Sequence, residues 1–147
     1  MKKLRVSFLI VALATVFTAQ GVAASHVAPV QVPATDSQAC DGGTKINDPV
    51  SGVAYPVLFG GFNGTITFTL TDSAAGQLLA FQTDSDLYHH VSSLLIKGGP
   101  DFANLYVYNP DVSNDSGLHA PTNAKNGKYY GVSHVCVYLV KKSPASA

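Results

Sequence analysis

Glutamate is absent from this 147-residue chain, arginine occurs once, at Arg5, and cysteine twice, at Cys40 and Cys136. Without glutamate, a glycosidase that works with two carboxyl groups would have to use aspartates alone. The sequence also lacks a G-x-S-x-G elbow, an H-E-x-x-H pair and a phosphate-binding glycine loop, which are the motifs of common hydrolases and nucleotide-binding enzymes. It therefore predicts neither an enzyme nor a cofactor.

The first 24 residues have the pattern of a removable export signal. Three basic residues within the first five positions precede an apolar stretch over 6–17, and residues 22–24 (Val-Ala-Ala) supply the small side chains that signal peptidase requires. The apolar stretch is too short for a comfortable membrane span. We expect cleavage after Ala24 and a secreted product, periplasmic or extracellular, that does not span a membrane once the signal is removed.

The charge of the chain changes when the signal is removed. The part that follows it contains six lysines, nine aspartates and no arginine, for a formal net charge of −3. A mildly acidic chain without arginine is poorly suited to contact phosphate backbones. We therefore expect no nucleic-acid partner.

The remaining residues are enough for one domain. Residues 25–39 are rich in Ala, Val and Pro without a period, which is typical of a flexible linker. We expect the domain itself over 40–140 and a disordered tail over 141–147. Two cysteines in an exported chain usually pair, so we predict a disulfide between Cys40 and Cys136. A redox or metal-binding thiol pair is the alternative, but the C-x-x-C spacing is missing.

Strict alternation of apolar and threonine residues marks a β-strand over 65–71, with Ile66, Phe68 and Leu70 facing the core. Turn-forming Gly, Pro and Asn residues separate further strand candidates, and no stretch shows a sustained helical period. The sequence thus predicts an all-β fold, a single antiparallel β-sandwich, immunoglobulin-like or jelly-roll-like, with the disulfide joining its terminal strands. The further strand candidates are 53–58, 77–83, 89–97, 105–108 and 129–140.

Two segments, 105–108 and 135–140, are apolar at almost every position. A strand that is covered on both faces shows this pattern, whereas an exposed edge strand alternates with polar residues. We therefore expect 135–140 to lie inside a sheet, and the shared pattern suggests that the two strands are neighbours.

Oxygen-bearing side chains at alternate positions, Asp111, Ser113 and Asp115, have the spacing that lets a tight loop wrap a calcium ion. An EF-hand would place its glycine one residue before Gly117 and a bidentate Glu where Thr122 stands. The alternative is an Asx-rich turn whose side chains bond their own backbone.

Histidines offer a second possible metal site. His119 and His134 could meet through the fold and form a site with one aspartate, although a structural histidine that donates a ring N–H to a loop carbonyl is the simpler reading. His89 and His90 are adjacent, so on a strand they point to opposite faces. Asp115, Ser116 and His119 have the residue types of a hydrolase triad, but triads are normally assembled from separate elements.

Three segments carry a recognisable signature: K-G-G at 97–99, D-S-G-L-H-A-P-x-N at 115–123, and S-H-x-C at 133–136. In these segments the chain resembles an uncharacterised family of secreted bacterial β-sandwich domains. The resemblance implies a compact extracellular module, often part of surface or matrix proteins. We expect the loop 115–123 to be structural, with Leu118 buried and His119 bonded inside the protein.

These patterns together predict an exported structural or binding module of the cell exterior or extracellular matrix. Its expected partner is a protein or glycan at the cell surface, and six of the seven tyrosines, from Tyr88 onward, could provide a stacking surface for it. The alternatives are a metal-dependent adhesin, a carbohydrate-binding domain and, third, a hydrolase.

Overall fold

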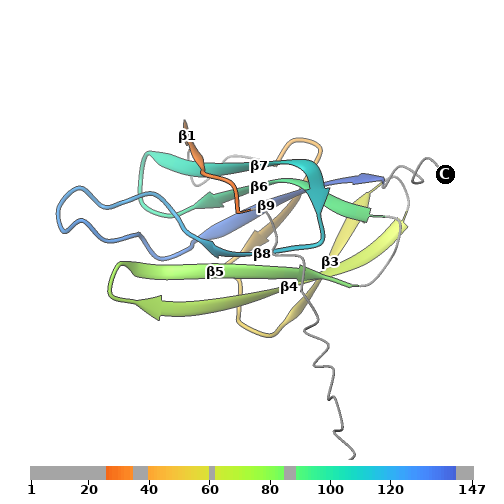
Figure 1. The fold of residues 1–147 in the computed structure, drawn as a ribbon, viewed down its shortest axis with the longest axis horizontal. Coiled ribbons are helices and arrows are strands. Elements are labelled where there is room, and N and C mark those ends of the chain that lie inside the picture. Colours follow the sequence, from red (N-terminus) through yellow and green to blue (C-terminus); the bar gives the residue numbers. More distant parts are fainter. Residues whose placement is uncertain (1–25, 35–39, 60–61, 85–88, 142–147) are drawn as a thin grey trace, which may run out of the picture.

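The computed structural model describes residues 26–34, 40–59, 62–84 and 89–141. These residues form nine strands in two antiparallel sheets, which confirms the predicted β-sandwich (Figure 1). Among them, no helix is long and apolar enough to cross a membrane. The predicted signal peptide, residues 25 and 35–39 of the predicted linker and residues 142–147 of the predicted tail lie outside the described residues. The strands are β1 (Val30–Pro33), β2 (Thr44–Asn47), β3 (Ala54–Phe59), β4 (Phe62–Ser73), β5 (Gly76–Thr83), β6 (His89–Lys97), β7 (Phe102–Val112), β8 (Asn114–Leu118) and β9 (His134–Lys141).

The four-stranded sheet has the order β3-β4-β5-β8, so its first three strands follow one another as hairpins. Its longest strand, β4, contains the predicted alternation: Ile66 and Phe68 are fully buried and Leu70 is partly buried, while the threonines between them are half-buried or exposed. This period-two pattern places one face of β4 on the core and the other toward solvent.

The five-stranded sheet has the order β1-β7-β6-β9-β2. Strand β9 lies between β6 and β2, as predicted for an apolar interior strand. The expected pairing of β7 with β9 is wrong, because β6 separates them. A second apolar cluster covers the outer face of this sheet at Cys136 in β9 and at Ala103 and Leu105 in β7, whereas Val107 of β7 is exposed. An apolar pattern on both faces therefore indicates a covered face but does not identify the neighbouring strand.

Two apolar clusters hold the sandwich together. The larger one fills the space between the sheets and includes Phe68, Phe81, Tyr106 and Leu118. The smaller one lies on the outer face of the five-stranded sheet, where Leu95 and Cys136 face each other across β6 and β9. Each sheet is therefore fixed mainly by the burial of its inner face, and the outer cluster adds a second layer to one of them.

The linker predicted over 25–39 is wrong for residues 30–33, which form the edge strand β1. Val30 pairs with Leu105 and Val32 with Ala103, so the domain begins before Cys40. A strand with Pro33 at its end is tolerated at a sheet edge, where the missing N–H disrupts no ladder. The Val-Gln-Val-Pro sequence therefore reads as a short edge strand whose alternation the surrounding Ala and Pro residues obscure.

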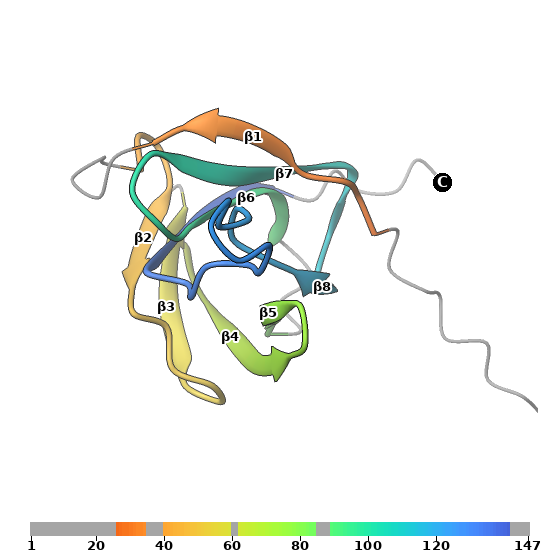
Figure 2. The same ribbon diagram turned by 90° about the vertical axis from the view of Figure 1, so that its left-hand side faces the viewer.

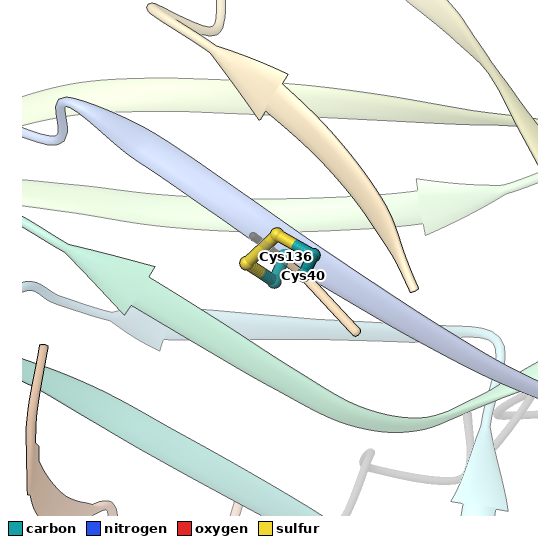
Figure 3. The surroundings of a disulfide bond; sticks show 2 residues. All are labelled: Cys40 and Cys136. Carbon is teal, nitrogen blue, oxygen red and sulfur yellow. A yellow bond between two sulfur atoms is a disulfide. The ribbon is translucent and has the colours of Figure 1, made fainter. Parts of the chain in front are cut away.

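The predicted disulfide is confirmed: Cys40 and Cys136 are bonded, with their Cα atoms 5.5 Å apart (Figure 3). Cys136 lies in β9, whereas Cys40 precedes β2 instead of lying in a terminal strand. Because β1 and β2 are the two edges of the same sheet, the chain between Pro33 and Thr44 connects its opposite edges, and the bond fixes this connection to β9. Structural disulfides of this kind are typical of oxidising compartments outside the cytoplasm.

Candidate functional site

The predicted calcium segment is extended and leads from one sheet to the other. Asp111 lies in β7, Ser113 between the strands and Asp115 in β8. The Oδ2 atom of Asp111 is 2.7 Å from Nδ1 of His90, and the Ser113 carbonyl accepts hydrogen bonds from the backbone N–H and hydroxyl of Thr83. Because the chain crosses between layers here, these oxygens serve separate structural contacts instead of surrounding one point.

The Asp115 carboxylate is buried beneath the sandwich surface. Its Oδ2 accepts a hydrogen bond from the Tyr108 hydroxyl at 3.0 Å, its Oδ1 accepts one from the Ser116 N–H at 2.7 Å, and Nδ1 of His26 lies 3.6 Å from Oδ1. Burial, together with the Asp115 charge, raises the pKa of Tyr108 well above its ordinary value of 10.0. The neutral hydroxyl of Tyr108 therefore acts as a lasting donor to Asp115.

His119 is held inside the protein, as predicted. Its Nδ1 lies 2.9 Å from the Ala120 carbonyl oxygen and 3.3 Å from the Asn104 amide nitrogen, so polar neighbours hold the ring in place. Its ring stacks on Tyr129 with the centroids 3.7 Å apart. The hydroxyl of Tyr106 accepts from the His119 N–H and donates to its carbonyl. Leu118 beside it is fully buried, which confirms the predicted burial of this side chain.

His134, the other candidate ligand, is buried in β9, where its backbone pairs opposite Asn47 and Lys97. Across the described ranges, no three His, Cys or Asp side chains come close enough to hold a metal ion. Asp115 and His119 also have different partners, so the three residue types of the local triad motif do not form a relay.

The K-G-G segment makes a different site. Gly98 and Gly99 form the β6–β7 turn, which packs against the long loop between β8 and β9. A Cβ at Gly98 would lie 2.4 Å from the Gly131 carbonyl oxygen, and one at Gly99 would lie 2.5 Å from the Tyr130 ring. The Lys97 side chain is buried, and its ammonium group donates a hydrogen bond to the Gly99 carbonyl oxygen, which fixes the turn. Only glycine permits this close approach of turn and loop.

The loop between β8 and β9 is ordered by its own backbone. Asn123 and Lys128 pair across it, Tyr130 donates to the Pro121 carbonyl at 3.0 Å, and Tyr129 donates to the Ala75 carbonyl at 2.7 Å. The last of these bonds ties the loop to the β4–β5 hairpin. Figure 1 shows this loop reaching beyond the sheets at the left, and Figure 2 views the same end of the molecule.

A cleft of about 280 Å³ lies where the turn and the loop meet the edge strand β1. Its aromatic side chains are Phe102, which is 44% exposed, and the half-buried Tyr130. Its polar side chains are Gln31, Asp101 and Thr122, all exposed, and no side-chain hydrogen bond joins them to other described residues. The lining is completed by Gly98, Pro100, Pro121 and Ala124. An open, mixed cleft of this kind is suited to binding a ligand.

A second hollow, of about 270 Å³, lies on the threonine face of the four-stranded sheet. Thr67, Thr69, Gln82 and Asn114 line it, and the Phe81 side chain beside it is buried in the core. The hollow therefore offers polar groups without an exposed ring, and it lies on the face of the sheet that is turned away from the core.

Sequence reasoning did not identify the cleft. Its polar and aromatic groups come from three distant segments, around Gln31, Phe102 and Tyr130, and none of them forms a motif by itself. The one local signal is the Gly-Gly-Pro run at 98–100, which marks a turn but says nothing about what packs on it.

Comparison with protein-family models, with curated proteins and with solved structures finds no match to this chain.

Proposed function

We propose that this chain is an exported, non-catalytic structural or binding module of the cell exterior or extracellular matrix, and that its binding site is the cleft between the β6–β7 turn and the β8–β9 loop. The observation that carries the proposal is the cleft itself. It joins an exposed Phe102 ring to three polar side chains without described partners, on a turn and loop that pack tightly together. Binding sites combine apolar surface with a few placed polar groups in this way.

The disulfide supports the compartment. The bond between Cys40 and Cys136 persists in an oxidising environment, and the signal-like residues 1–24 supply a route to it. An exported binding or structural module also fits the resemblance of the sequence to secreted β-sandwich domains.

A metal-dependent adhesin is less well supported than direct binding. Asp111 contacts His90, and Asp115 is buried against Tyr108, so both carboxylates of the predicted calcium segment already have protein partners. A cation at this position would have to displace those contacts. The cleft requires no such rearrangement.

Co-sedimentation with cell-envelope material from the producing cells tests the proposal. We expect the purified exported protein to sediment with the envelope, and Phe102→Ala to reduce the bound fraction at least fivefold. Val107→Ala is the matched control, because Val107 lies on the same strand, is 56% exposed and does not line the cleft. Equal retention of both variants, or no sedimentation of the parent protein, would contradict a binding role for the cleft.

A further inference from the structure

We infer that the ligand of the cleft is a neutral sugar ring of an envelope or matrix glycan, an inference that rests on the proposed binding function. Ring packing, hydrogen bonding, charge and size each favour this ligand class over an anion or a peptide segment.

The aromatic groups supply an apolar platform. Phe102 presents 44% of its surface to solvent, and the Tyr130 ring is fixed against Gly99 on one side while it lines the cleft. A sugar ring has apolar C–H faces between its hydroxyl groups, and such faces pack on aromatic rings. Exposing Phe102 has a cost in water, which a ligand that covers the ring removes.

The polar groups match hydroxyls. Asp101 can only accept hydrogen bonds when it is ionised, while the Gln31 amide and the Thr122 hydroxyl can both donate and accept. Sugar hydroxyls also donate and accept, so the several hydroxyls of one sugar ring offer partners for each of these side chains. Hydrogen bonds to the charged Asp101 carboxylate are the strongest of the set.

The charge of the cleft argues against anionic ligands. Asp101 is the one ionisable side chain in the lining besides the phenol of Tyr130, and no lysine contributes to it. A phosphate, sulfate or carboxylate ligand would meet this negative charge without a compensating cation. A neutral polyol carries no such penalty.

Size and shape favour a compact ligand. At about 280 Å³ the cleft lies just below the range of roughly 300 to 1,000 Å³ that holds drug-sized molecules. Most of its lining comes from turn and loop residues, so it does not offer the long unpaired strand edge that an extended peptide would join. Pro100 and Pro121, with the packed glycines, keep the walls preformed, which limits the entropy cost of binding a small ligand.

An array of neutral, sialylated and sulfated oligosaccharides, probed with the purified exported protein, tests the inference. We expect binding to neutral glycans, weaker or no binding to their sulfated forms, and a dissociation constant at least tenfold higher for Phe102→Ala and for Asp101→Asn. Val107→Ala and Asp72→Asn are the matched controls, because both residues are exposed and lie outside the cleft, and they should bind like the parent protein. Thermal melts of all four variants verify that each is folded.

The outcomes separate the two proposals. Glycan binding that is lost in both cleft variants supports both. Envelope co-sedimentation that depends on Phe102 but is not competed by any neutral glycan overturns the sugar and keeps the binding cleft. Glycan binding that survives both cleft substitutions overturns the placement of the sugar in this cleft. A parent protein that binds neither envelope nor glycans overturns both.

Discussion

Replacing both cysteines, Cys40→Ala with Cys136→Ala, should strongly destabilise the domain. The bond closes a loop whose ends are 96 residues apart in sequence. Removing it returns conformational freedom to the unfolded chain, while the native strands keep their hydrogen bonds. The loss should therefore appear in the unfolding equilibrium rather than in the sheet content.

The magnitude follows from the length of the loop. A closure of this length lowers the entropy of the unfolded chain by about 16 cal/mol/K, or about 4.7 kcal/mol at 25 °C. Each alanine also removes a buried sulfur from the outer cluster, which adds to the loss. For a domain of this size, we expect a fall in melting temperature of roughly 15 to 20 °C.

Denaturant unfolding followed by far-UV circular dichroism measures the effect, since the chain has no tryptophan to report by fluorescence. The parent protein treated with a reductant at neutral pH is the second arm and should approach the midpoint of the double variant. The control is the single variant Val107→Ala, because Val107 is exposed on the same sheet and its truncation should change the stability little. A loss below about 1 kcal/mol would refute the chain-entropy argument for this bond.

Three further predictions concern the core, the turn and the tyrosines. Leu118→Ala should cost about 3 kcal/mol in denaturant unfolding, since the side chain is fully buried between the sheets; a loss under 1 kcal/mol would contradict its role as an anchor. Gly99→Ala should cost on the order of 2 kcal/mol and alter the near-UV signal of the tyrosines, because Gly99 has a φ of +75° and a Cβ would meet the Tyr130 ring; an unchanged melting curve would exclude this contact. Burial raises the pKa of Tyr106 and of Tyr108, so their native forms hold protons that the unfolded chain releases near pH 10. The stability that this protonation supplies is complete below that pH and is lost as the pH rises further. An absorbance titration at 295 nm should show at least two tyrosines that ionise only with unfolding, and full ionisation of a chain that is still folded would contradict this.

Alternation was enough to predict the strands that cover a large core. The alternation over Thr65–Thr71 predicted which face of β4 lies on the core. The apolar run around Cys136 predicted that β9 lies inside a sheet. The short strands β1, β2 and β8 were missed, because four or five residues hold too few alternations to stand out from a loop. The order of the strands could not be predicted either, since apolar residues show that a strand face is covered but not which strands pair with it in the sheet.

The site was harder to predict than the fold for a physical reason. Asp111, Asp115 and His119 stood out because their residue types can bind metals, yet the fold gives each of them a protein partner. The cleft groups have ordinary residue types and gain their meaning only from the packing of distant loops. Gln31 belongs to a strand that the sequence did not reveal, so its proximity to Phe102 could not be inferred.

The pairing of β2 with β9 sets the order in which the domain can be completed. Strand β2 is a sheet edge whose neighbour is formed near the end of the chain, and Cys40 just before it bonds to that same strand. The roughly 90 residues between them take about 5 to 20 s to synthesise. Throughout that interval β2 has no neighbouring strand to pair with, whereas the β3–β4–β5 hairpins can form as soon as they are made. The five-stranded sheet is therefore completed at its β2 edge only after β9 has been made, although β2 is among the first strands to be synthesised.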